Sequence, residues 1–406
     1  METFDWIVIG NGLAGAALSY ELVRLGLSVL LVDDGNPDSA TRCSYGGIAY
    51  WSGTNEITRE LCQAGIERHR QLSDELETET EFRELDLLLT FPPHVDGESL
   101  TRQYEQFAIA PRLISPQEAQ EIEPQLNPAA IGGAFTVKHG HVNPIKTVDG
   151  FNQAFRRLGG QHMLATVTGL VHINNRVTGI MTASQAYAAG NVVVAAGGNS
   201  RRLLHQARLS VPLYHTHAEI VALPKVEQPL RALIMPGIAT RFEAEATASD
   251  PATDSRWDGP PDEIAPPILD AGMIQFLDGS TYLGQVSRFR TDLGTEAIDA
   301  AQSEAQIRQG ITSQVPCLAN VPGRWRHCLV TFSRDELPLI GPLPGVEGLH
   351  LFSGFTSPFA ILLPIAQRFA SWAMNGEKTA LDSLSDRLLG QMLVTRFEKS
   401  PPDTTT

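Results

Sequence analysis

The chain has 406 residues, of which 42% are hydrophobic and 19% charged, and it carries a formal net charge of −15. This length exceeds one simple core and predicts a globular protein of two domains. The negative charge argues against nucleic acid or an anionic membrane surface as a partner, and the lack of an apolar run of about 18 residues argues against a membrane span.

The first predicted elements surround a glycine-rich turn. An apolar run at residues 6–9 leads into Gly10, Gly12 and Gly15, and a helical pattern and a second apolar run follow, ending on Asp33. In this order a G-x-G-x-x-G motif predicts dinucleotide binding, rather than the ordinary turn of an α/β unit. Gly10 permits the tight turn, Gly12 lets the backbone approach a pyrophosphate, and Gly15 allows close packing of helix on strand.

The acid that follows the motif indicates which dinucleotide is accepted. Asp33 stands 18 residues after Gly15, about where a carboxylate meets a ribose hydroxyl. A carboxylate there repels a 2′-phosphate, so NADP is disfavoured, whereas NAD and FAD both fit the motif.

The middle of the chain alternates between helical and extended patterns. Within residues 56–90 we expect a charged amphipathic helix from Ile57 through Leu76. Further along we expect a short helix at 116–124, a helix at 144–158, and short strands at 165–171 and 177–182. An apolar strand over residues 191–198 ends in small residues. This strand predicts a return of the chain to the nucleotide-binding domain.

Residues 212–325 have a different character. Alternating apolar and polar residues at 219–223, 272–277 and 281–284 predict antiparallel sheet. The acidic, proline-rich stretch 243–267 is expected to form a surface loop. Helices are expected at 295–312 and 360–374.

Five blocks, in this order and spacing, resemble the D-amino-acid oxidase, glycine oxidase and sarcosine oxidase superfamily of flavoproteins. The blocks are the glycine motif with Asp33, and the segments 44–47, 140–144, 192–198 and 335–354. Together they cover nearly the whole chain. The resemblance implies an α/β fold in which a Rossmann-like FAD-binding domain is interleaved with an antiparallel-sheet substrate domain.

The resemblance also implies a division of the chain. Residues 1–80, 140–211 and 326–385 would form the discontinuous FAD-binding domain, 81–139 and 212–325 the substrate domain, and 386–406 a C-terminal extension with a polar tail.

FAD is the cofactor that the resemblance implies, and the residues expected to hold it come from several segments. On the ADP half these are Gly10, Gly12, Leu13, Ala14, Gly15, Asp33, Asp34, Val167, Ala196 and Gly197. Around the flavin they are Arg42, Ser44, Gly46, Gly47, Cys328, Gly354, Phe355, Thr356 and Ser357. The last of these precede a helix whose N-terminus suits negative charge on reduced flavin.

Cys328 carries a more specific hypothesis. It stands seven positions before Asp335, the spacing at which the sarcosine oxidase branch attaches its flavin covalently. An 8α-thioether to FAD is therefore expected at Cys328. The alternative is a small buried thiol that only fills a strand position.

Three positions depart from the family's pattern. Val330 stands where members that bind a carboxylate have an arginine, and Tyr282 stands where the sarcosine branch has an oxygen-activating lysine. Pro358 replaces a second lysine. Neither the carboxylate clamp nor efficient reaction with oxygen carries over, so the electron acceptor is either oxygen or a quinone or protein.

Candidate residues for the substrate are therefore sought elsewhere. An anionic substrate needs a cation, because an unpaired buried charge is costly, and Arg288, Arg290, Arg326 and Arg334 are the candidates. Tyr50, Trp51 and Tyr282 are candidates for an aromatic wall. His215 and His217 share a strand face but lack a third ligand nearby, so no metal is expected.

The resemblance implies an oxidoreductase that removes a hydride from the carbon next to nitrogen in an amine or amino acid, giving an imine that water hydrolyses. Three alternatives stay open: the flavin domain of a tRNA wobble-uridine modification enzyme, an oxidoreductase of 2-hydroxy acids, and a flavin-binding protein without turnover. The acidic charge and the missing methyltransferase partner domain argue against the first.

The start of the chain and its cysteines bear on location. The first predicted strand begins by Phe4, which leaves no room for a targeting peptide. The four cysteines, Cys43, Cys62, Cys317 and Cys328, have no C-x-x-C spacing that would indicate a metal cluster or a disulfide framework. The expected location is the cytoplasm.

Overall fold

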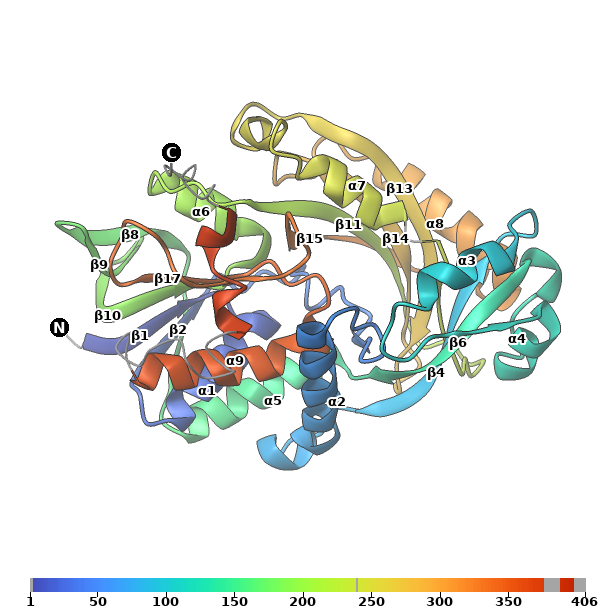
Figure 1. Cartoon of the computed structure of the whole chain (residues 1–406), viewed down its shortest axis with the longest axis horizontal. Coiled ribbons are helices and arrows are strands. Elements are labelled where there is room, and N and C mark those ends of the chain that lie inside the picture. Colours follow the sequence, from blue (N-terminus) through green and yellow to red (C-terminus); the bar gives the residue numbers. More distant parts are fainter. Residues whose placement is uncertain (1–2, 239, 376–387, 398–406) are drawn as a thin grey trace, which may run out of the picture.

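A computed structural model describes residues 3–238, 240–375 and 388–397 of the chain. Within these residues the strands form two sheets, one of eight strands and one of nine. Figure 1 shows the first sheet at the left and the second at the right, with helix α2 (Glu56–Leu76) between them. The predicted polar tail lies outside the described residues, apart from 388–397.

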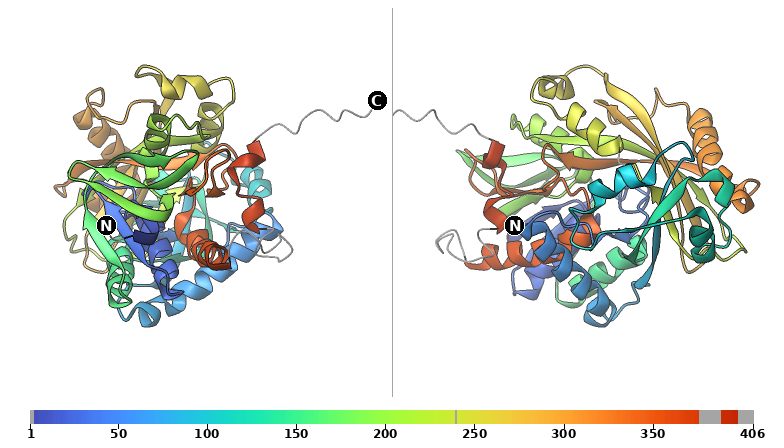
Figure 2. Two further views of the ribbon diagram at one scale, coloured as in Figure 1. Left: turned by 90° about the vertical axis from the view of Figure 1, so that its left-hand side faces the viewer. Right: turned by 45° about the vertical axis from the view of Figure 1, so that its right-hand side comes forward.

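The first sheet has the order β16-β17-β10-β1-β2-β7, with β8 and β9 continuing from β10. Its strands are β1 (Thr3–Ile9), β2 (Val29–Asp33), β7 (Gln161–Leu164), β8 (Val167–Ile173), β9 (Arg176–Thr182), β10 (Ala186–Val194), β16 (Leu339–Pro342) and β17 (Leu349–Ser353). Strand β1 pairs in parallel with β2 and β10, and β10 pairs in parallel with β17. The left view of Figure 2 shows the blue N-terminal strand beside the green ones. The predicted return of the chain to this sheet is therefore confirmed.

Alternation along β1 explains why both faces of this sheet are covered. Trp6 and Val8 point to the face packed by α1 (Leu13–Arg24), α5 (Pro144–Arg157), α9 (Pro358–Asn375) and α2. Ile7 and Ile9 point to the opposite face, toward β8, β9 and α6 (Ser200–Gln206). Because successive strand residues face opposite sides, a continuous apolar run such as residues 6–9 suits a strand buried on both faces.

The second sheet is largely antiparallel and follows the order β15-β11-β14-β13-β12-β4-β6-β3, with β5 beside β6. Its strands are β3 (Gly47–Ile48), β4 (Arg83–Phe91), β5 (Arg112–Ile114), β6 (Gly133–His141), β11 (Leu213–Leu223), β12 (Leu233–Pro236), β13 (Glu263–Gln275), β14 (Thr281–Arg290) and β15 (Arg324–Ser333). The predicted α/β class, a Rossmann-like half interleaved with an antiparallel half, is confirmed.

The two faces of the second sheet have different coverings. On one face, α8 (Ala300–Gln314) and α4 (Pro116–Ile122) pack against apolar residues that include Val221 and Met273. The other face carries an aromatic and aliphatic cluster with Trp51, Phe107 and residues of α3 (Gly97–Tyr104). This second face borders the cavity described below.

Several sequence expectations need correction in detail. The stretch 243–267 is not a loop, because α7 (Thr240–Ala248), a 3-10 turn (Asp254–Asp258) and the start of β13 occupy it. The amphipathic helix expected from Ile57 through Leu76 is confirmed as α2, whereas the rest of the stretch 56–90 is not helical, because β4 begins at Arg83. The acidic composition misled because α7 and β13 are half exposed, so polar residues occupy their outer positions.

Two segments cross the expected domain division. Strand β15 pairs with β11 from residue 324 to 333, so it lies wholly in the second sheet although the division runs through it at 326. Strand β3 pairs with β6 of the same sheet, which ties residues 47–48 to the second half. Among the described helices, none combines the length and apolar character that a membrane crossing demands.

Candidate functional site

A cavity of about 1790 Å³ lies between the two halves of the protein. It is bordered by the turn between β1 and α1, the loop after β2, the end of β10, strand β15, and residues around β12, α7 and β13. Pockets for a single small ligand commonly measure roughly 300–1,000 Å³. The cavity is therefore large enough for a dinucleotide and a second molecule together.

The glycine turn forms one end of the cavity, here called the turn end. Gly10 has a φ of +106°, and a Cβ there would lie 2.5 Å from the carbonyl oxygen of Ala195. A Cβ on Gly15 would lie 1.7 Å from the carbonyl oxygen of Gly10. Both positions therefore require glycine, as the motif predicted, because side chains would collide with backbone.

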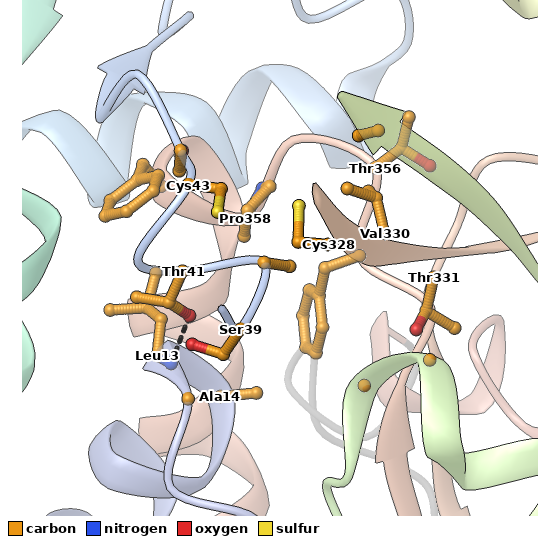
Figure 3. A pocket seen from close by; sticks show the side chains of 18 of the residues that line it. Leu13, Ala14, Ser39, Thr41, Cys43, Cys328, Val330, Thr331, Thr356 and Pro358 are labelled. Atoms are coloured by element: carbon orange, nitrogen blue, oxygen red, sulfur yellow. Dashed lines mark hydrogen bonds between the residues drawn. The ribbon is translucent and has the colours of Figure 1, made fainter. Parts of the chain in front are cut away.

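The N-terminus of α1 is open toward this end. The N-cap residue Gly12 offers no side chain to the helix, and no acidic residue stands in the first turn. The backbone N–H of Leu13 donates to Thr41 Oγ1 at 3.0 Å, a bond drawn as a dashed line in Figure 3. The other N–H groups of the first turn have no intrahelical partner, so this helix end suits an anion such as a phosphate.

Asp33 ends β2 with its carboxylate already engaged by the backbone. Its two oxygens accept hydrogen bonds from the N–H groups of Asn11 and Gly35, each at 2.7 Å. The carboxylate thus fixes the loops on both sides of the turn end. A carboxylate has about four acceptor positions, so lone pairs stay available to a ribose hydroxyl.

One buried polar atom at the turn end has no partner. Among the described residues, Asn11 Oδ1 is buried and accepts no hydrogen bond. Asp34, Val167, Ala196 and Gly197 also border the cavity. An uncapped helix end, a carboxylate and an unpaired amide oxygen suit the phosphates and hydroxyls of a dinucleotide, so the residues present fit the ADP half of FAD.

The opposite part of the cavity, here called the cysteine end, is bordered by Cys43, Cys328, Val330 and Thr356. Figure 3 shows these side chains around one space, with Pro358 at the start of α9 beside them. Cys328 lies on β15 opposite Ala218 of β11, and Cys43 belongs to the loop after β2.

The two glycine-rich segments expected to surround the flavin both reach this end. A Cβ on Gly46 would lie 2.1 Å from the carbonyl oxygen of Val142, and one on Gly47 would lie 2.6 Å from His139 Nε2. Ser44 Oγ accepts a hydrogen bond from the N–H of Gly46 at 3.2 Å. The loop therefore lies tightly on the second sheet.

The segment before α9 is the other glycine-rich segment. Gly354 has a φ of +84°, Phe355 packs in the core beneath the first sheet, and Ser357 accepts a backbone hydrogen bond from Ala360 at 3.2 Å. Gly354, Phe355, Thr356 and Ser357 all border the cavity, so the N-terminus of α9 faces it.

The thiols of Cys43 and Cys328 interact. A hydrogen bond with Cys328 lowers the pKa of the Cys43 thiol, and the positive charge of Arg326 lowers it further. The same hydrogen bond and complete burial raise the pKa of Cys328. Because the thiolate is the nucleophilic form of cysteine, the surroundings favour Cys43 over Cys328 as the more reactive thiol.

Trp51 and Arg326 are the two expected substrate contacts that border the cavity. The other candidates do not border it within the described part of the chain: Tyr50, Tyr282, Arg288, Arg290 and Arg334. Arg288 Nε donates to Glu219 Oε1 at 2.7 Å, and Arg290 Nε lies 3.0 Å from Asp292 Oδ1. Both guanidinium groups are thus neutralised inside the second half.

The two tyrosines are also engaged elsewhere. Tyr50 packs against the helical core of the first half. Tyr282 donates its hydroxyl hydrogen to the carbonyl oxygen of Arg42 at 3.1 Å and lies behind the two cysteines. Arg42 itself borders the cavity.

The other cations and the histidines named above have partners as well. Arg326 binds Asp38 Oδ1 at 2.9 Å, and Arg334 binds the hydroxyl of Tyr214 at 3.0 Å. His215 and His217 both contact the carbonyl oxygen of Asp292. No set of three metal-binding side chains occurs in the described residues.

The wall of the cavity on the second sheet includes Trp51, which the sequence named as a candidate for an aromatic wall, and further residues that the sequence did not single out. Its apolar part consists of Trp51, Leu87, Leu89, Tyr104, Phe107, Leu233 and Met235. Its charged part includes Arg241 on α7 and Asp270 on β13. One sequence signal could have indicated the helix that carries Arg241, namely the spacing of four residues between Arg241 and Glu245. This pair lies at the edge of the stretch 243–267, which was expected to form a loop.

Known proteins similar to this chain include FAD-dependent oxidoreductases. The family model described as FAD dependent oxidoreductase (DAO) matches residues 5–372. The hydrogen cyanide synthase subunit HcnC of Pseudomonas aeruginosa is 23% identical over 396 residues, which cover 86% of each chain. The glycine oxidase of Pseudomonas putida is 22% identical over 391 residues, covering 93% of this chain and 96% of the other.

Solved structures show the same fold. The glycine oxidase of Geobacillus kaustophilus superimposes with a TM-score of 0.75 at 18% identity, covering 94% of this chain and 98% of the other.

Proposed function

Because the chain belongs to the family of FAD-dependent oxidoreductases, we propose that it oxidises the carbon next to nitrogen in a small amine or amino acid. A hydride leaves that carbon, and the resulting imine is hydrolysed by water. The observation that carries the proposal is a continuous cavity, which joins the glycine turn to a wall on the second sheet with both apolar and charged side chains.

FAD is the cofactor of this family, and it supplies the group that accepts a hydride. We infer that the ADP half is held by Gly10, Gly12, Leu13, Ala14, Gly15, Asp33, Asp34, Val167, Ala196 and Gly197. We infer that the flavin half is held by Arg42, Ser44, Gly46, Gly47, Cys328, Gly354, Phe355, Thr356 and Ser357. The open N-terminus of α1 offers N–H groups to the pyrophosphate, as the fit at the turn end supports.

The protein's own contribution to the reaction is to orient the substrate and to exclude water. The apolar side chains on the second-sheet wall, such as Leu87, Leu89 and Met235, lower the local dielectric and keep bulk water from the reacting carbon. The N-terminus of α9, which begins at Pro358, adds partial positive charge at the cysteine end. This charge favours a cofactor that gains electrons.

The substrate class is supported by the relatives. The similar protein of Pseudomonas putida is named for the oxidation of glycine, an amino acid. A half-buried cation and a half-buried carboxylate on the same cavity wall, Arg241 and Asp270, suit a molecule that carries both a carboxylate and an amine.

The electron acceptor is a separate part of the proposal. We infer that a quinone or a protein accepts electrons faster than oxygen, because Tyr282 replaces the lysine that activates oxygen in the sarcosine branch. Its hydroxyl is bound to the carbonyl oxygen of Arg42 and accepts from Arg326. Comparing reoxidation of the reduced enzyme by air and by a soluble quinone tests this.

The decisive experiment is anaerobic bleaching of the bound flavin. The purified holoenzyme is mixed with glycine, sarcosine, the D- and L-amino acids, simple amines and 2-hydroxy acids, and the flavin absorbance is followed. Bleaching by an amine or amino acid supports the proposal. Bleaching by 2-hydroxy acids alone indicates the alternative C–O chemistry, and bleaching by none indicates a flavin protein of another kind.

A further inference from the structure

Around α7 and β13, the charged part of the second-sheet wall combines the cation Arg241 with several carboxylates. Arg241 lies on α7 and borders the cavity with 24% of its side chain exposed. Asp270 on β13 and Glu336 after β15 border the same space. Glu245, one turn beyond Arg241, is buried behind it.

The Arg241 side chain contacts Glu245 and Phe242 but keeps hydrogen-bond donors unused. Its Nε lies 3.6 Å from Glu245 Oε1, beyond hydrogen-bond distance, and its guanidinium stacks on the ring of Phe242 at 5.1 Å. In the described part of the chain no hydrogen bond is formed by this side chain. A guanidinium has five N–H donors in a planar fork that matches a carboxylate, so Arg241 can bind an incoming carboxylate in two-point contact.

Asp270 has the complementary property. Burial raises the pKa of its carboxyl group, while the charge of Arg241 opposes that rise. A carboxylate in this position is stabilised by a cation that enters the cavity and takes the place of water.

Asp270 stands two residues before Gly272, the residue of β13 that the loop of Cys43 contacts through Tyr45. Burial raises the pKa of the Tyr45 hydroxyl, and the charge of Asp270 adds to this effect. Tyr45 belongs to the same loop as Cys43 and donates its hydroxyl hydrogen to the carbonyl oxygen of Gly272 at 3.2 Å. An ammonium group at Asp270 would therefore be close to the loop expected to cover the flavin.

The apolar part of the same wall suits the remainder of such a substrate. Phe107 packs edge-on against Trp51 at 5.2 Å, and the Tyr104 hydroxyl is satisfied by the carbonyl oxygen of Gly237 at 2.8 Å. These rings offer apolar surface without an unpaired polar group, so a bulky hydrocarbon side chain is favoured over the hydrogen of glycine.

We propose that Arg241 and Asp270 recognise the two charged groups of an α-amino acid with a bulky apolar side chain, Arg241 binding the carboxylate and Asp270 the ammonium group. This inference rests on the proposed function, because it names the substrate class of the same cavity. In this proposal the substrate carboxylate binds at α7. It does not bind at the position on β15 where Val330 replaces the arginine of carboxylate-binding members.

The test uses two probes that cannot be oxidised, so that binding is measured without turnover. One is 3-phenylpropionate, which has a carboxylate but no amine. The other is 2-phenylpropan-2-amine, whose nitrogen-bearing carbon has no hydrogen. Their affinities for the holoenzyme are measured by titration calorimetry in the wild type, R241Q and D270N.

R241Q should weaken 3-phenylpropionate binding roughly 30-fold and leave the amine within about twofold, because charged hydrogen bonds carry this much affinity. D270N should do the reverse. The matched controls are R112Q and D86N, which remove exposed charges with side-chain exposures of 66% and 36%. They should change neither affinity.

The outcomes separate this inference from the proposed function. If R241Q and D270N bind both probes as the wild type does, or if the wild type binds neither probe, the inference is overturned whatever the bleaching experiment shows. If the probes discriminate as expected but no amino acid bleaches the flavin, recognition stands and the oxidation fails. Phenylalanine or leucine should also exceed glycine in kcat/KM by roughly tenfold or more, given the apolar area buried, and equal values would contradict the apolar wall.

Discussion

The two halves of the cavity are built in different ways. At the turn end, Gly10, Gly15 and Asp33 come from one continuous stretch, and the backbone itself makes the site. At the second-sheet wall, Trp51, Arg241 and Asp270 come from segments far apart in the sequence, and side chains make the site. The proposed nucleotide site therefore leaves a local signature in the sequence, whereas the proposed substrate site does not.

The difference extends to what stabilises each half. The first half depends on close backbone approach at glycines and on apolar strands buried on both faces. The second half contains a buried network in which Glu219 on β11 connects Arg288 on β14 and Trp325 on β15. Three substitutions and a change of pH test this difference between the two halves.

The substitution E219Q should affect the second half most. Glu219 has no solvent exposure, and Arg288 would be left as an uncompensated charge, which costs roughly 3–5 kcal/mol of unfolding free energy. Urea unfolding measures this loss, and the folded fraction should keep its FAD. D86N removes a surface partner of Lys138 in the same sheet and should cost less than about 1 kcal/mol. Equal losses in the two variants would show that the network does not stabilise the second half.

The substitution G15A should affect the first half and its cofactor together. Its Cβ would lie 1.7 Å from the carbonyl oxygen of Gly10, so the turn must open at a cost of roughly 3 kcal/mol, and FAD should no longer copurify. The matched control is G169A on β8, where a Cβ would meet nothing within 4 Å. Retention of a full complement of FAD by G15A would contradict the backbone explanation of the turn end.

Acidification should destabilise the second half more than the first. Burial lowers the pKa of histidines in both halves: to about 4 for His69, His350 and His215, and to about 3 for His139, His141 and His217. Unfolded histidine takes up a proton near pH 6.5, so the unfolded state binds more protons between pH 6.5 and about 4. Stability is therefore complete above pH 6.5 and falls as the pH drops through this range.

The measurement is the pH dependence of local stability. Each buried histidine adds a slope of at most about 1.4 kcal/mol per pH unit, and His139, His141, His215 and His217 belong to the second sheet. Hydrogen exchange at pH 7.5 and 5.5 should show strands of the second sheet losing protection first. The variant H139Q should flatten the slope, whereas H94Q, at an exposed histidine, should leave it unchanged.

The smallest effect concerns the cysteine end. If Cys328 carries a thioether to FAD, wild-type protein should keep one FAD per chain after acid denaturation, and C328S should release it. Loss of the buried thiol itself should cost only about 1 kcal/mol. C43S is the matched control and should keep its FAD if the thioether is at Cys328. Release of FAD from C43S would instead indicate Cys43, whose pKa the surroundings lower. An unmodified mass for the wild-type chain would leave Cys328 as a buried thiol.

Much of the fold was predictable because its signals are periodic and local. The apolar run at 6–9, the glycines and the strand expected at 191–198 identified the parallel sheet, and the alternation at 219–223 and 281–284 identified the antiparallel one. The segment 243–267 was misjudged because half-exposed elements carry the acidic composition of a loop.

The substrate side chains were harder to predict for a physical reason. The alternation of Arg288 and Arg290 placed them correctly on one strand, but the sequence contains no record of which carboxylates stand opposite. Pairing with Glu219 and Asp292 neutralises both. Arg241 and Asp270 border the cavity because α7 packs on β13, a contact between segments that sequence spacing does not encode.

The order of residues was enough to identify the glycine turn, the family and the cofactor, because a backbone that approaches a phosphate needs glycine at fixed spacing. Which charged side chains border the cavity with unused hydrogen-bonding capacity became known only from the tertiary structure. That capacity depends on every segment packed around each charge, as the pairing of Arg288 with Glu219 shows.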